Sequence, residues 1–122
     1  MTHPRITLIT FRVALVVALI VTMYLATTQQ EFPVIDDTND KVKHILAFYV
    51  LAFLADHSVP KVRFNLSKGL TILGYGLLIE VIQYFLPYRE FSLFDLAADG
   101  VGIAAYAFSQ AVLGRFYILR RL

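Results

Sequence analysis

Cysteine and tryptophan are absent from this chain, and only 16% of its residues are charged. The absence of cysteine excludes disulfide frameworks, thiolate nucleophiles and zinc sites that are built on thiolates. The basic residues are divided among the termini and loops, and the net charge is only +2. They therefore form no basic stripe of the kind that binds nucleic acid, and we expect no nucleic-acid partner.

Hydrophobic residues are what the chain has in abundance. They make up 58% of its 122 residues, and the mean hydropathy is +0.67. Such values lie outside the range of ordinary soluble domains and indicate an integral membrane protein. The sequence shows no strand alternation, internal repeat or low-complexity linker. We therefore expect a single all-α transmembrane domain that covers residues 1–122.

Long apolar runs divide the chain into four expected membrane helices. The first run is long and lacks a convincing cleavage site, which favours a retained helix over a cleaved signal peptide. The second run is short for a full span and polar at both ends, so it needs neighbouring helices to be stable. The others follow apolar runs with capping residues at their starts. The expected helices cover residues 8–27, 42–57, 66–86 and 93–114.

The basic residues set the expected orientation, because short loops rich in lysine and arginine stay in the cytoplasm. In a four-helix bundle most of them fall on one side: Arg5, Arg12, Lys61, Arg63, Lys68, Arg115, Arg120 and Arg121. The other side carries an acidic excess: Glu31, Asp36, Asp37, Asp40 and Glu90. Both termini are therefore expected to be cytoplasmic.

Polar residues at helical spacing predict a site at the outer end of this bundle. Asp40 and His44 are four residues apart, and so are Asp95 and Asp99, so each pair shares a helix face. Glu80 stands about 9 Å below the end of its helix, where lipid cannot solvate a carboxylate. We therefore predict an outward-facing polar pocket, formed by Asp40, Lys41, His44, Glu80, Gln83, Arg89, Asp95 and Asp99.

Each of these residues also has a structural explanation. Asp40 and Lys41 suit the interface as a helix-start carboxylate and a snorkelling cation. Glu80 and Arg89 can form an ion pair that only locks two helices together. Asp95 lies three residues after Ser92 in a capping-box arrangement. These alternatives stay open at the level of sequence.

Four short motifs resemble the VanZ-like family of small bacterial membrane proteins, which is associated with resistance to teicoplanin and other glycopeptides. They are D-K-x-x-H from Asp40, E-x-x-Q from Glu80, P-x-R from Pro87 and D-x-x-x-D-x-x-G from Asp95. The resemblance covers about residues 37–114 and implies a multi-pass protein of the bacterial cytoplasmic membrane. The family pattern commonly has asparagine where this chain has Asp99. The resemblance supplies no reaction.

The residue types in the pocket suit a phosphate or carboxylate on a lipid or a cell-envelope precursor, because lysine, arginine and protonated histidine are charge-assisted donors. We expect anionic or phosphate-bearing membrane lipids as partners, and no resident cofactor or metal. A divalent cation at Glu80, Asp95 and Asp99 is the less favoured alternative. Two further hypotheses are a small enzyme acting on a lipid phosphate or ester, and a structural subunit of a membrane complex. The sequence leaves the oligomeric state open.

Overall fold

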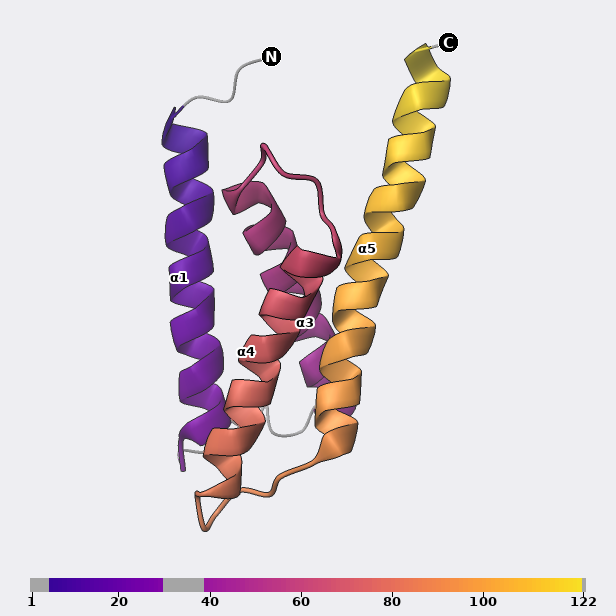
Figure 1. The fold of residues 1–122 in the computed structure, drawn as a ribbon. Coiled ribbons are helices and arrows are strands. Elements are labelled where there is room, and N and C mark those ends of the chain that lie inside the picture. Colours follow the sequence, from indigo (N-terminus) through magenta and orange to yellow (C-terminus); the bar gives the residue numbers. More distant parts are fainter. Residues whose placement is uncertain (1–4, 30–38, 122) are drawn as a thin grey trace.

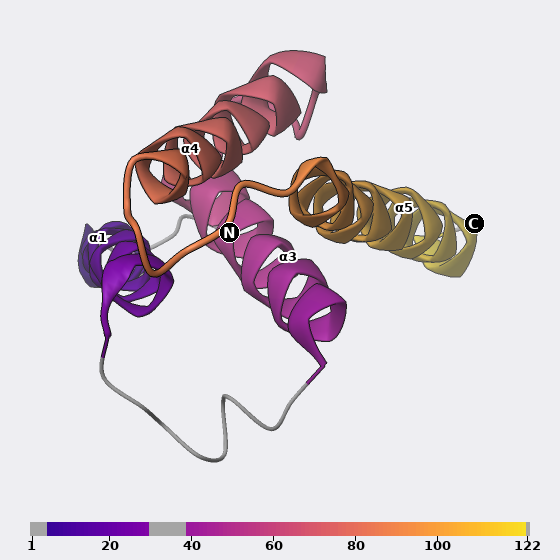
Figure 2. The same cartoon turned by 90° about the horizontal axis from the view of Figure 1, so that it is seen from below.

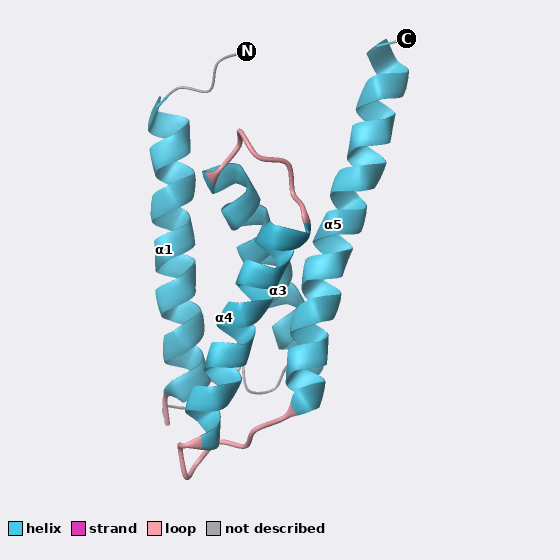
Figure 3. Cartoon of the chain, in the orientation of Figure 1, coloured by secondary structure: helices cyan, strands magenta, loops and turns pink. Residues whose placement is uncertain are grey.

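A computed structural model describes residues 5–29 and 39–121, with side chains described up to residue 113. Within these ranges the chain forms helices and loops and no strand (Figures 1 and 3). The helices are α1 (Arg5–Thr27), α3 (Asp40–Ser58), α4 (Leu66–Tyr84) and α5 (Leu93–Arg121). The all-α expectation is confirmed. The acidic residues Glu31, Asp36 and Asp37 and the side chains of Arg115, Arg120 and Arg121 lie outside the described part.

Side-chain caps fix where three of the helices begin. Asn39 accepts a hydrogen bond from the Lys41 backbone N–H at 2.9 Å, so α3 starts at Asp40, two residues before the expected position. Asn65 accepts one from the Lys68 N–H at 2.9 Å and starts α4, as expected. Ser92 accepts one from the Asp95 N–H at 3.3 Å and starts α5. Each cap satisfies a backbone donor that a first helical turn leaves unpaired.

Helices α1, α4 and α5 are long and apolar enough to cross a membrane. Their candidate spans are Arg5–Thr27, Leu66–Tyr84 and Leu93–Leu113. Helix α5 continues past the expected end at Gly114 as far as Arg121. Helix α3 has 19 residues but is not among the candidates, since it carries charged residues at both ends. Three candidate spans are therefore shown, against four expected.

Helix α3 occupies the middle of the bundle. Seen along the helices, it lies between α5 on one side and α1 and α4 on the other (Figure 2). Its buried residues Phe48 and Leu51 meet Ile79 of α4 and Tyr106 of α5 in one apolar core. The residues of α5 that share a stripe, from Asp95 through Tyr106, turn toward this core. Asp95 and Asp99, which share a helix face by their spacing, are therefore both buried.

Two glycines allow the helices to approach closely at the level of the polar residues. A Cβ atom on Gly102 of α5 would collide with the backbone carbonyl oxygen of Ile45 on α3. A Cβ on Gly76 of α4 would lie 2.6 Å from the Asp99 Oδ2 atom and 3.1 Å from the Phe48 ring. Gly102 thus permits backbone contact between α3 and α5, and Gly76 leaves room for a buried carboxylate.

A second polar cluster fastens the opposite end of α3. The Lys68 ammonium donates to the Asp56 carboxylate at 2.8 Å and to the backbone carbonyls of Val59 and Val62 at 2.8 and 2.5 Å. The other carboxylate oxygen of Asp56 accepts a hydrogen bond from the Tyr106 hydroxyl at 2.6 Å. Lys68 therefore ties together the end of α3 and the α3–α4 loop, and Asp56 links both to α5.

Replacing Gly102 with alanine tests the close contact between α3 and α5. The added methyl group must push against the backbone of Ile45, so we expect a loss of about 1–3 kcal/mol in the free energy of unfolding. Gly74→Ala is the matched control, because a Cβ at that exposed helical position meets no atom within 4 Å. Unfolding in mixed micelles, followed by circular dichroism, measures both. Equal stabilities for the two variants would contradict the packing described here.

Candidate functional site

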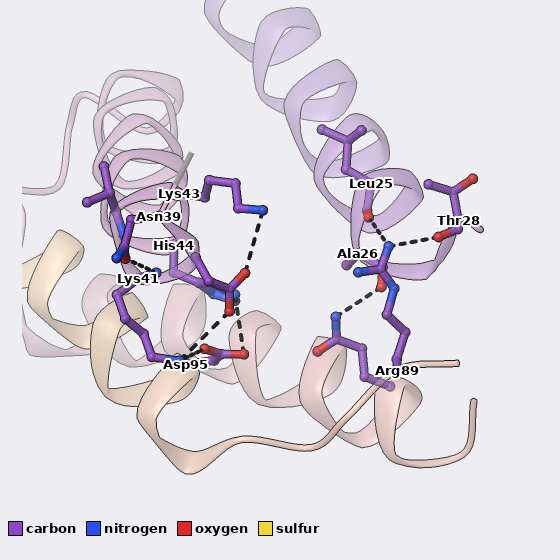
Figure 4. A network of polar contacts seen from close by, with 12 residues as sticks. Leu25, Ala26, Thr28, Asn39, Lys41, Lys43, His44, Arg89 and Asp95 are labelled. Carbon is purple, nitrogen blue, oxygen red and sulfur yellow. Dashed lines mark hydrogen bonds and ion pairs between the residues drawn. The ribbon is translucent and has the colours of Figure 1, made fainter. Parts of the chain in front are cut away.

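Ion pairs join the first turns of α3 and α5 at one end of the bundle. The Lys41 ammonium donates to Oδ1 of Asp95, in a contact that links the two helices. It also lies 3.8 Å from Asp40 Oδ2, and the Lys43 ammonium lies 3.6 Å from Asp40 Oδ1. Figure 4 shows Lys41 and Asp95 close to His44, with Lys43 on the same helix. The two lysines are partly exposed, while Asp95 is buried.

His44 lies deeper, between two carboxylates of α5. Its Nδ1 atom is 2.6 Å from Asp99 Oδ1, and its Nε2 atom is 3.6 Å from Asp95 Oδ2. An ionised carboxylate can only accept, so Nδ1–H donates to Asp99. The Asp99 side chain is 1% exposed, and the ring of His44 is therefore oriented by a carboxylate held inside the bundle. We call Asp40, Lys41, His44, Asp95 and Asp99 the outer cluster.

Glu80 of α4 adjoins the outer cluster from the inside. It is fully buried, and its Oε2 atom accepts a hydrogen bond from the Ser92 backbone N–H at 2.9 Å. Ser92 is also the cap of α5, so the Glu80 carboxyl group is directed at the helix turn that carries Asp95. It interacts electrostatically with His44, Asp95 and Asp99. Its Oε1 atom has no hydrogen-bond partner among the described residues.

Gln83 lies one turn further along α4 and contacts α1. Its amide nitrogen donates to the backbone carbonyl of Ala26 at 2.9 Å. Its Oε1 atom is buried without a hydrogen-bond partner in the described part of the chain. Gln83 therefore bonds to the end of α1, and among the described residues no hydrogen bond joins its side chain to the outer cluster.

Arg89 caps the end of α1 and does not join the outer cluster. Its guanidinium group donates to the backbone carbonyls of Leu25 at 3.0 Å and Thr28 at 2.7 Å (Figure 4). The neighbouring Tyr88 hydroxyl donates to the Thr27 carbonyl at 2.6 Å. Within the described ranges no ion pair joins Arg89 to a carboxylate. The Glu80–Arg89 ion pair considered as a structural alternative is thus not formed.

The structure therefore divides the eight predicted pocket residues into two groups. The outer cluster and Glu80 meet at the junction of α3, α4 and α5, whereas Gln83 and Arg89 secure the end of α1. Asp95 stands in the first turn of α5 and pairs with Lys41, whereas the Ser92 N–H that a capping box would direct at Asp95 bonds to Glu80. Ser92 was expected to cap this helix, but its contact with Glu80 leaves no signature in the sequence.

The charge balance around the outer cluster is acidic. Four carboxylates, Asp40, Glu80, Asp95 and Asp99, stand against the ammonium groups of Lys41 and Lys43. The potential metal-ligating atoms that come together differ from the carboxylate set of the less favoured alternative, Glu80, Asp95 and Asp99. They belong to Asp40, His44 and Asp95, and they lie within 4.8 Å of one another. The carboxylates and His44 can bind a cation, and the two lysines can bind an anionic group.

Comparison with known proteins places the chain in no family. No family model matches it, and no curated protein and no solved structure does so either. The resemblance to the VanZ-like family therefore rests on its four short motifs. Two of the four motifs contain residues of the outer cluster, and a third contains Glu80. The fourth contains Arg89, which binds the end of α1.

Replacing Arg89 with alanine removes the donors to the last carbonyls of α1. A hydrogen bond from a charged group contributes about 1.5–3 kcal/mol, so we expect lower stability and faster amide exchange at residues 24–29. Glu90→Ala is the control, because Glu90 is the exposed neighbour of Arg89. Hydrogen exchange read by mass spectrometry measures the effect. Exchange at the end of α1 that matches the parent would contradict a capping role.

Proposed function

We propose that the chain is a four-span protein of the bacterial cytoplasmic membrane whose termini face the cytoplasm. Helix α3 is the proposed fourth span, and its 19 residues correspond to about 28 Å at 1.5 Å per residue, close to the hydrocarbon thickness. Its charged ends are balanced by ion pairs, Lys41–Asp95 at the start and Asp56–Lys68 near the end. Its central place in the bundle supports the same topology (Figure 2).

The proposed function is recognition of a phosphate-bearing head group on a membrane lipid or a cell-envelope precursor. The observation that carries this proposal is the meeting of charged side chains from α3, α4 and α5 at one end of the bundle. The side chains of Lys41 and Lys43 are 44% and 30% exposed there, so their ammonium groups are accessible from the head-group layer. Ammonium groups are suitable donors to phosphate oxygens.

The basic loops and the motif resemblance support the rest of the proposal. The excess of lysine and arginine in the terminal segments and the α3–α4 loop favours a cytoplasmic location for these parts, which puts the outer cluster outside. The resemblance to the VanZ-like family suggests a contribution to teicoplanin resistance. Recognition of an envelope precursor is a physical route to that effect, because glycopeptides act on the same class of molecule.

A second candidate is an enzyme that acts on a lipid phosphate or ester. One contact favours it: Asp99 holds the Nδ1 atom of His44 at 2.6 Å, which is how a carboxylate orients a histidine that acts as a general base. Incubating the purified protein with labelled phospholipids separates the two candidates. Product that depends on His44 favours the enzyme, and saturable binding without product favours recognition.

The recognition proposal predicts that Lys43→Gln weakens the binding of phosphatidylglycerol about threefold to tenfold. Among the described residues Lys43 has one ion-pair partner, the exposed Asp40, so its loss removes a donor to phosphate and leaves no buried charge unpaired. Lys41→Gln should weaken binding more. Because this variant also leaves the buried Asp95 carboxylate without its lysine partner, its stability must be measured as well. Lys61→Gln, on the loop at the opposite end, is the control. Native mass spectrometry of protein–lipid complexes measures the affinities.

Two results would oppose this proposal. One is lipid binding by Lys43→Gln and Lys41→Gln that equals binding by Lys61→Gln. The other concerns cells: expression of the parent at equal membrane abundance should raise teicoplanin tolerance above that of the Lys41→Gln variant, and equal tolerance would remove the link to resistance.

A further inference from the structure

Nitrogen Nε2 of His44 and Oδ2 of Asp95 face each other across the α3–α5 contact at 3.6 Å. The other ring nitrogen, Nδ1, is taken up by Asp99, so Nε2 is the ring atom that remains for a further partner. A neutral ring presents a lone pair at this atom. A cation placed between Nε2 and the carboxylate oxygen can bind both.

The spacing of these atoms fits coordination of a metal ion. Two ligand atoms at about 2.1 Å from a tetrahedral ion lie about 3.4 Å from each other, close to the 3.6 Å found here. Asp40 stands one helical turn before His44, and its carboxylate completes a set whose ligand atoms all lie within 4.8 Å of one another. Asp99 meanwhile fixes the ring through its other nitrogen, as carboxylates do for many histidine ligands.

The buried carboxyl group of Glu80 is a second observation beside this set, because one of its oxygens lacks a partner in the described part of the chain. It is 0% exposed, yet its Oε1 atom has no hydrogen-bond donor among the described residues. Its other oxygen bonds to the Ser92 N–H, which directs the group at the turn that carries Asp95. A buried polar atom left without a partner is costly, and a bound ion is one of the few ways to satisfy it.

The neighbouring lysines leave Oδ2 of Asp95 free and make only long ion pairs with Asp40, at 3.8 Å from Lys41 and 3.6 Å from Lys43. Lys41 binds Oδ1 of Asp95, whereas the atom that faces His44 is Oδ2, so the two oxygens serve different cations. Lys43 contacts Asp40 at 3.6 Å, the longer and weaker kind of ion pair. The four carboxylates around the site exceed the two ammonium groups, and a divalent ion would offset the difference.

We propose that Asp40, His44 and Asp95 bind a divalent transition-metal ion and that this ion contacts the phosphate of the head group. An imidazole ligand beside carboxylates favours Zn²⁺ or Mn²⁺ over Mg²⁺ and Ca²⁺. Three protein ligands leave coordination positions open for phosphate oxygens, and the exposed Lys41 stands next to them. The role of the ion rests on the function proposed above, whereas metal binding itself does not.

The test is titration of the full-length protein with Zn²⁺ after treatment with a chelator. The protein is purified in detergent through an affinity tag that contains no histidine, and uptake is followed by isothermal titration calorimetry. We expect one Zn²⁺ per chain and at least a tenfold loss of affinity in His44→Ala. Asp99→Asn, which alters only the partner of the histidine, should weaken binding about 10- to 100-fold.

His57→Ala is the matched control, because His57 lies at the other end of α3 and bonds to the Phe53 carbonyl at 2.9 Å. It should bind Zn²⁺ as the parent does. Equal affinities for His44→Ala and His57→Ala would overturn the proposal, and so would a parent protein that shows no saturable uptake. The latter result would leave a proton, shared between His44 and Asp95, as the better explanation.

If His44→Ala does not fold, X-ray absorption spectroscopy on the Zn²⁺-bound parent protein tests whether His44 is a ligand. The spectrum should show the scattering of one imidazole ring together with oxygen ligands, and a spectrum of oxygen ligands alone would overturn the proposal. Lipid binding measured with and without Zn²⁺ then separates the two proposals. Phosphatidylglycerol binding that needs Lys43 but gains nothing from Zn²⁺ would remove the bridging role and retain recognition.

Discussion

The contact between the α3 and α5 backbones is the constraint on which the candidate site depends. Gly102 permits it, because any side chain there would meet the carbonyl of Ile45. Asp99 and Asp95 precede this glycine by one and two helical turns on the same face. The contact therefore brings both carboxylates against His44, which directly precedes Ile45. Apolar packing sets the distance between α3 and α5, and this distance brings the polar side chains into contact.

Cations that bind backbone carbonyls hold the two ends of the bundle. Arg89 donates to the last carbonyls of α1, and Lys68 donates to carbonyls at the end of α3 and in the loop that follows. Carbonyls in the last turn of a helix lack intrahelical partners, and a cation at a helix C-terminus is also favoured by the helix dipole. The positive charges of Arg89 and Lys68 thus stabilise the fold. The outer cluster remains available for a ligand.

Much of the fold and part of the site could be predicted from the sequence, because both depend on periodic patterns. Apolar runs predicted the helices, and four-residue spacing predicted that Asp95 and Asp99 face inward beside His44. The partner of Arg89 could not be predicted, since backbone carbonyls have no residue signature. Asp56 was overlooked for a related reason: an acidic residue near a helix end looks solvated until Lys68 and Tyr106 are found against it.

The charged ends of α3 have a consequence for how the protein enters the bilayer in the proposed topology. If α3 entered the bilayer alone, Lys41 and Asp56 would lack their ion-pair partners. Unpaired charged residues make insertion of a helix into lipid unfavourable. Its partners arrive later in synthesis, Lys68 on α4 and Asp95 on α5. In this topology we expect α3 to become stable in the bilayer only after α4 and α5 have been synthesised.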